Sequence, residues 1–139
     1  MIMRAYIFSF LLFCLVAPAI LGQTLSAREI FELYKRENFE ELKKLSASQA
    51  GKPETAADLY IKALLAGDGE KSITLLETLL LRYPRTEFAV AAYAGLYLYY
   101  EATENFRKAN NCIFAVENEF PDADFDFFLD DSNPEDIGE

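Results

Sequence analysis

The chain has 139 residues, none of which is histidine, and only two cysteines, Cys14 and Cys112. Without histidine, an enzyme lacks its most common general base and a metal site lacks its most common transition-metal ligand. The sequence also lacks a glycine-rich phosphate loop, a Cys/His metal set and a nucleophile motif. We therefore expect no catalytic residues, no cofactor and no metal ion, and we predict that the protein is not an enzyme.

Positive charge is missing from the C-terminal part of the chain. Ten of the 23 acidic residues lie between Glu117 and Glu139, where there is no lysine or arginine, and the other 13 balance the 13 basic residues. The net charge of −10 therefore belongs to this stretch. Because such a stretch repels nucleic acid and anionic lipid, we expect no nucleic-acid partner.

One acidic motif in that stretch resembles the start of a calcium site. Asp122, Asp124 and Asp126 have the spacing that begins an EF-hand loop. Such a loop then requires a glycine where Phe127 stands and a glutamate where Asn133 stands. The sequence therefore does not favour specific calcium binding.

A long apolar run occurs only at the N-terminus. Residues 1–22 have the parts of a secretory signal peptide: the positive charge of Arg4, an apolar run over 6–16, and small residues at 17–19, with Gly22 as a second possible cut. An uncleaved anchor is the alternative, but a membrane-spanning helix needs about 20 apolar residues. We expect an exported protein, periplasmic or secreted, with no membrane span after signal removal.

Signal removal would leave Cys112 as the single cysteine, which excludes an internal disulfide. Cys112 lies within a helical pattern, next to Ile113. A structural thiol, wholly or partly buried, is therefore favoured over a reactive one.

Apolar residues after the signal recur at helical rather than alternating spacing, which predicts an all-α domain over residues 23–121. Ser26 and Glu29 have the spacing of a capping box at the start of the first helix. Phe106, Ala109, Ile113 and Val116 are expected on the inner face of the last helix. The expected helices are one from Ser26, a short one over 39–45, and then 53–66, 70–83, 86–102 and 104–120.

Two prolines end similar stretches of sequence. Pro84 and Pro121 each follow an aromatic residue, and a small residue, Ser72 or Ala109, lies twelve positions before each of them. Self-similarity at a period of about 34 residues is typical of helical-hairpin repeats. We therefore expect three antiparallel helix pairs stacked side by side, in which the small residues let neighbouring helices approach closely.

These residues resemble the tetratricopeptide repeat family, in particular the lengthened repeats of bacterial envelope proteins, which end in Tyr-Pro or Phe-Pro. The resemblance implies a short right-handed stack whose first helices line a peptide-binding groove. It also implies a protein-binding scaffold in envelope assembly or division. Tyr60, Tyr99 and Tyr100 are the candidate partner contacts, whereas core packing is favoured for Tyr93 and Tyr97.

The acidic segment 122–139 alternates acids with the apolar residues Phe125, Phe127 and Phe128. It allows three interpretations: a folded-back plug over the apolar face of the last helix, a partner-docking motif, or disorder, which the final residues favour. The main alternative to a protein-binding scaffold is a self-associating module whose terminal apolar face is buried in a homodimer.

Overall fold

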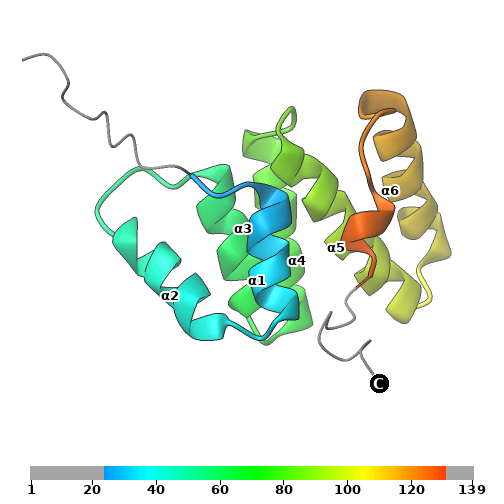
Figure 1. The fold of residues 1–139 in the computed structure, drawn as a ribbon. Helices are drawn as coiled ribbons and strands as arrows, with labels where there is room; N and C mark the ends of the chain where they lie inside the picture. The colour runs from blue at the N-terminus through cyan, green and yellow to red at the C-terminus, as the bar shows by residue number, and fades with distance from the viewer. Residues whose placement is uncertain (1–23, 131–139) are drawn as a thin grey trace, which may run out of the picture.

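The described secondary structure is entirely helical. A computed structural model describes residues 24–130, so the expected signal peptide and residues 131–139 lie outside the described part. Within it there is no strand, which confirms the all-α prediction (Figure 1). The elements are α1 (Ala27–Lys35), α2 (Phe39–Ser48), α3 (Ala56–Leu65), α4 (Gly69–Arg82), α5 (Glu87–Ala102), α6 (Phe106–Glu119) and a 3₁₀ turn, η1 (Asp126–Phe128).

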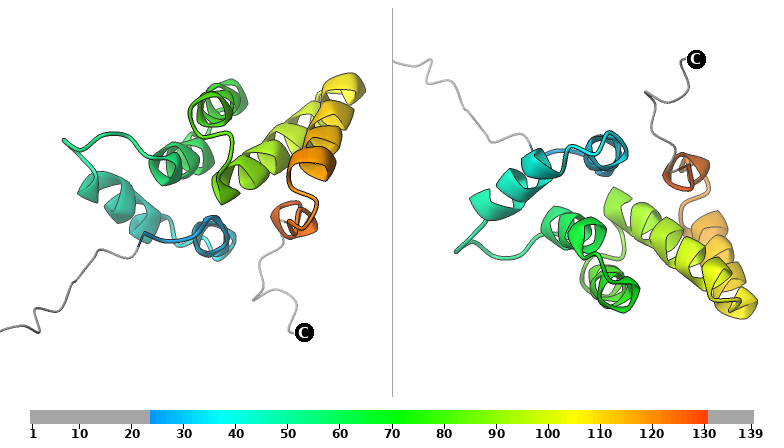
Figure 2. Two further views of the ribbon diagram at one scale, coloured as in Figure 1. Left: turned by 90° about the horizontal axis from the view of Figure 1, so that it is seen from above. Right: turned by 90° about the horizontal axis from the view of Figure 1, so that it is seen from below.

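The helices form two closely packed hairpins and a looser N-terminal pair. The closest associations are those of α3 with α4 and of α5 with α6, and α4 also packs on α5. Helix α1 touches α2, α3 and α5. Both views of Figure 2 place η1 between α1 and the α5–α6 hairpin, so the C-terminal segment lies beside the N-terminal helix.

Capping boxes define two of the helix starts. The capping box predicted at Ser26 and Glu29 is present. The prediction that the third helix starts near Pro53 is wrong, because a second capping box joins Thr55 and Asp58 and starts the helix after Thr55. The Asp58 carboxylate is 4 % exposed, and the backbone N–H and hydroxyl of Thr55 satisfy it.

The turns after α1 and after α5 have the same geometry. Glu37 and Glu104 both have a φ of 57°, in the left-handed region. The next residues, Asn38 and Asn105, donate their N–H groups to carbonyls five residues earlier, at 2.9 and 2.7 Å. The predicted start of the last helix at Glu104 is therefore wrong, because this residue forms the left-handed end of α5.

The ends of α4 and α6 also match. Tyr83 (φ −130°, ψ 54°) and Phe120 (φ −135°, ψ 57°) each donate the N–H to the carbonyl four residues earlier. Each of them precedes one of the prolines that the sequence singled out. Tyr83 also donates its hydroxyl to the carbonyl of Glu54, which ties the end of α4 to the start of α3.

Small residues lie where the helices pack most tightly. Ala109 on α6 is fully buried, as expected. Between α4 and α5 the tight position is Gly95, where a methyl group would lie 2.7 Å from a methyl carbon of Leu76. The expectation for Phe106 is wrong, since its side chain is 55 % exposed. It is the first residue of α6, where the Cα–Cβ bond tilts toward the N-terminal end of the helix and away from its following turns.

Candidate binding surface

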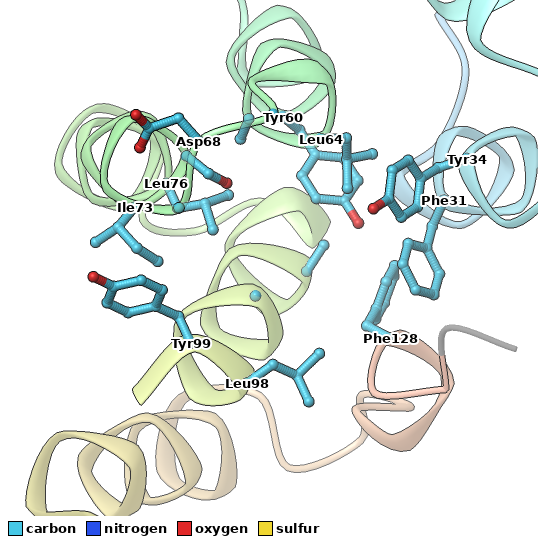
Figure 3. Close-up of a pocket in the computed structure, with 16 residues that line it drawn as sticks. Phe31, Tyr34, Tyr60, Leu64, Asp68, Ile73, Leu76, Leu98, Tyr99 and Phe128 are labelled. Carbon is cyan, nitrogen blue, oxygen red and sulfur yellow. The ribbon is translucent and has the colours of Figure 1, made fainter. Parts of the chain in front are cut away.

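An apolar pocket of about 300 Å³ opens among α1, α3, α4 and α5, and η1 forms part of its wall (Figure 3). Its labelled aromatic residues come from four elements: Phe31 and Tyr34 from α1, Tyr60 from α3, Tyr99 from α5 and Phe128 from η1. This volume is at the lower end of the range for ligand pockets. It is therefore large enough for one or two apolar side chains of a bound segment.

The predicted tyrosines differ in how far they reach this pocket. Tyr99 is half-buried and lines the wall, with its ring toward Ile73 in Figure 3. Tyr60 also lines it but is only 3 % exposed, and burial raises the pKa of its phenol. The free protein thus presents Tyr99, together with Leu98 on the rim at 39 % exposure, and little of Tyr60.

Tyr100 does not line the pocket. It is 8 % exposed, its hydroxyl lies 3.2 Å from a carboxylate oxygen of Glu77, and the ammonium of Lys108 lies 5.1 Å from its ring centroid. Burial, followed by the charge of Glu77, raises the pKa of Tyr100. The residue therefore holds α5 to α4 rather than facing the pocket.

The C-terminal segment is folded back, and its three rings pack against residues of both α1 and α5. The rings of Phe127 and Phe128 pack on Phe31 of α1, at centroid distances of 5.8 and 5.6 Å. Phe125 packs on Tyr97 of α5, at 6.2 Å. Phe125 also lines one hollow together with Ile113 and Val116 of α6, so the segment reaches the face named in the plug interpretation, while the other two rings pack against the first helix.

Charged groups accompany these ring contacts. The guanidinium of Arg28 donates to the carboxylate of Asp124 at 2.6 Å and lies 3.7 Å from the ring centroid of Phe127. Lys35, two turns further along α1, lies 4.9 Å from the same centroid. The hydrogen bond from Arg28 lowers the pKa of Asp124. The sequence analysis did not predict Arg28, Phe31 and Lys35 as site residues. Their spacing places them on one face of a helix, and the positive charges of Arg28 and Lys35 are opposite to those of the acidic segment, which was the available signal.

The single described cysteine is buried. Cys112 is 5 % exposed on the inner face of α6, and burial raises its pKa to about 11. At neutral pH it is therefore a thiol that packs as a small apolar side chain, as the sequence analysis favoured.

No protein-family model matches the chain, and comparisons with curated proteins and with solved structures found no match either. Within residues 24–130, no helix is long and apolar enough to cross a membrane. The same part of the chain holds no cluster of three or more potential metal-ligating residues.

Proposed function

We propose that the chain is an exported, non-catalytic protein-binding module whose pocket accepts apolar side chains from a segment of a partner protein. The observation that carries the proposal is that the pocket wall already includes one such side chain, Phe128, supplied by the chain's own C-terminal segment. A surface that accepts a phenylalanine from a turn of its own chain is chemically suited to accept one from another chain.

The polar groups around the pocket support binding rather than catalysis. Asp68 is the only carboxylate among the residues that line it, and its oxygen accepts the N–H of Lys71 as the cap of α4. Serine and tyrosine hydroxyls complete the polar lining. A general base paired with a nucleophile or a second carboxylate would favour an enzyme, and this lining has neither.

We further propose that the helices form a short tetratricopeptide-like stack. The repeated turns support this. Glu37 and Glu104 share a left-handed geometry, and Tyr83 and Phe120 share a different one with negative φ. Helices α1, α3 and α5, the first of each pair, all contribute to the pocket, as the resemblance implies for a peptide groove. The proposed place in the bacterial envelope rests on that resemblance and on the signal-like residues 1–22.

Photo-cross-linking in bacterial cells that produce the full chain tests the proposal. A benzoylphenylalanine replaces Leu98, on the pocket rim, or Leu81, which is 84 % exposed on α4 and does not line the pocket. We expect a discrete product with another protein from position 98 and none from position 81. Equal products from both positions, or none from position 98, would contradict a protein-binding pocket.

Self-association is the second candidate function, and exposed rings on α6 favour it. Phe106 and Phe114 are 55 % and 67 % exposed, and their spacing of eight residues puts them on one side of the helix. Paired with a second copy, this face would bury both rings. Sedimentation at micromolar concentration checks it: a dimer that Phe114→Ser converts to a monomer supports self-association, and a monomeric wild type excludes it at that concentration.

A further inference from the structure

The segment 124–128 meets α1 through several kinds of contact at once. Its acidic group, Asp124, pairs with Arg28 across 96 positions of sequence. The aromatic ring of Phe127 lies within 3.7 Å of the Arg28 guanidinium and 4.9 Å of the Lys35 ammonium. One cation thus contacts both the carboxylate and the ring of the segment, and cations favour the face of an aromatic ring.

The two adjacent rings of the segment fit against one ring of α1. Phe127 and Phe128 lie edge to face with each other, 5.1 Å apart, and each contacts Phe31 within 6 Å. Such arrangements are favoured because the positive edge of one ring meets the negative face of another. This surface of α1 therefore contacts an acid and the two adjacent aromatic residues that follow it.

We infer that the α1 surface formed by Arg28, Phe31 and Lys35 is a docking site for short acidic protein segments that carry adjacent aromatic residues. Residues 124–128 occupy this docking site as an intramolecular ligand, and a partner segment of the same chemistry replaces them. The inference rests on the proposed function, because it names the class of segment that the pocket region binds and the contact that regulates access to it.

The contacts that hold the segment are partly solvent-accessible, which makes it exchangeable. The side chains of Arg28 and Asp124 are 46 % and 63 % exposed, and ion pairs of that kind contribute little to stability. The rings of Phe127 and Phe128 are only half-buried, and η1 has three residues. Segments held in this way belong to the parts of a protein that open at low free-energy cost.

The short connection between α6 and residues 124–128 determines how strongly this attached segment competes with a free peptide for the docking site. Only four residues separate Glu119 from Asp124, so the segment acts at an effective concentration on the order of millimolar or higher. A free peptide of the same sequence therefore binds the intact protein weakly. It binds more tightly when the two rings of the attached segment are removed.

Fluorescence anisotropy with a labelled peptide of residues 122–130 tests this in the full chain. The peptide is titrated with the wild type and with the Phe127→Ala/Phe128→Ala variant, which we expect to bind it at least tenfold more tightly. Adding Arg28→Glu to the double variant is expected to weaken binding at least tenfold. Arg107→Glu, an equal charge change on the exposed side of α6, is the matched control and is expected to have no effect.

Each other result overturns the inference. If the double variant binds no better than the wild type, or if Arg28→Glu has no more effect than Arg107→Glu, the docking site is not the one inferred. If circular dichroism shows that the double variant is unfolded, the segment is a fixed part of the core and not an exchangeable ligand. If the wild type sediments as a dimer that Arg28→Glu dissociates, the segment serves a second copy instead.

The peptide-binding experiment can fail independently of the photo-cross-linking experiment that tests the proposed function. Cross-links from position 98 that persist although the peptide does not bind would reject the docking site and retain the protein-binding pocket. If the peptide does not bind and position 98 gives no cross-links, both the docking site and the protein-binding pocket are rejected. A peptide that binds as expected, together with cross-links from position 98 that Arg28→Glu weakens, would support both.

Discussion

Replacement of Leu79 by alanine tests the packing on which the pocket depends. Leu79 is fully buried on α4, where this helix meets its neighbours, and no solvent reaches its side chain. Removal of a buried leucine costs the transfer energy of the lost methyl groups and leaves a cavity that the surroundings fill only in part. We therefore expect Leu79→Ala to lower the free energy of unfolding by about 3 kcal/mol, within the range of 2–5 kcal/mol for such sites.

Leu81 provides a matched control two residues away on the same helix. Its side chain is 84 % exposed, so Leu81→Ala makes the same chemical change without a cavity and should stay within about 0.5 kcal/mol of the wild type. Urea denaturation followed by circular dichroism at the helical band measures both. In a thermal scan of a domain of this size, the Leu79 variant should melt roughly 10–15 °C lower.

Two results would refute the packing. Equal losses at both positions would mean that α4 has no distinct inner face. A larger loss at Leu81 than at Leu79 would mean that α4 is rotated, so that the residues now placed on the pocket wall, such as Ser72 and Leu76, would face elsewhere.

Three further predictions concern single groups. Glu104→Gly should raise the free energy of unfolding by up to about 1 kcal/mol in urea denaturation, because it removes a side chain from a left-handed backbone position. In a protein whose other cysteine is serine, native Cys112 should react with a disulfide reagent at neutral pH at least tenfold more slowly than in urea, because burial raises its pKa to about 11. The pKa of Glu54 is lowered chiefly by its hydrogen bond from Lys62 and also by the charge of Arg82, so its stabilisation is present above the ordinary glutamate pKa of 4.5 and is lost as pH falls through the lowered value. Glu54→Gln should therefore destabilise the protein at pH 7 but not at acidic pH, and wild-type behaviour at pH 7 would contradict that ion pairing.

Local signals in the sequence predicted much of the helix pattern. The capping box at Ser26 depends on two residues three positions apart, and such contacts follow from spacing alone. The recurrence of Glu-Asn-Phe at 37–39 and 104–106 corresponds to two turns of equal geometry. The prediction nevertheless placed Glu104 inside the last helix, whereas this residue precedes it.

Competing local signals explain the errors in helix placement. Pro53 suits the first turn of a helix, but the capping box of Thr55 and Asp58 lies two residues later and starts α3 there. Phe106 has the spacing of an inner-face residue, yet it is the first residue of α6 and its side chain is exposed. Apolar periodicity alone does not show which residues at the end of a helix have another helix packed against them.

The binding surface was less predictable because its parts are distant in sequence. The acids and rings of the C-terminal segment stood out as unusual, but nothing near them in the chain indicated Arg28 or Phe31 as their partners. Those contacts bridge 96 positions and exist only because the fold brings α1 beside η1, the turn that follows α6. Tyr99 and Tyr100 were both predicted as partner contacts, whereas burial separates Tyr100 from Tyr99 in the structure.

Nuclear Overhauser spectroscopy of the protein with isotope-labelled phenylalanine is the most direct test of the central claim, that the C-terminal segment occupies a binding surface on the first helix. The account predicts cross-peaks from the ring of Phe31 to the rings of both Phe127 and Phe128, which Phe31→Ala identifies by their loss. It also predicts that excess peptide 122–130 weakens these intramolecular cross-peaks. Spectra of the folded monomer without any cross-peak between Phe31 and those two rings would contradict it.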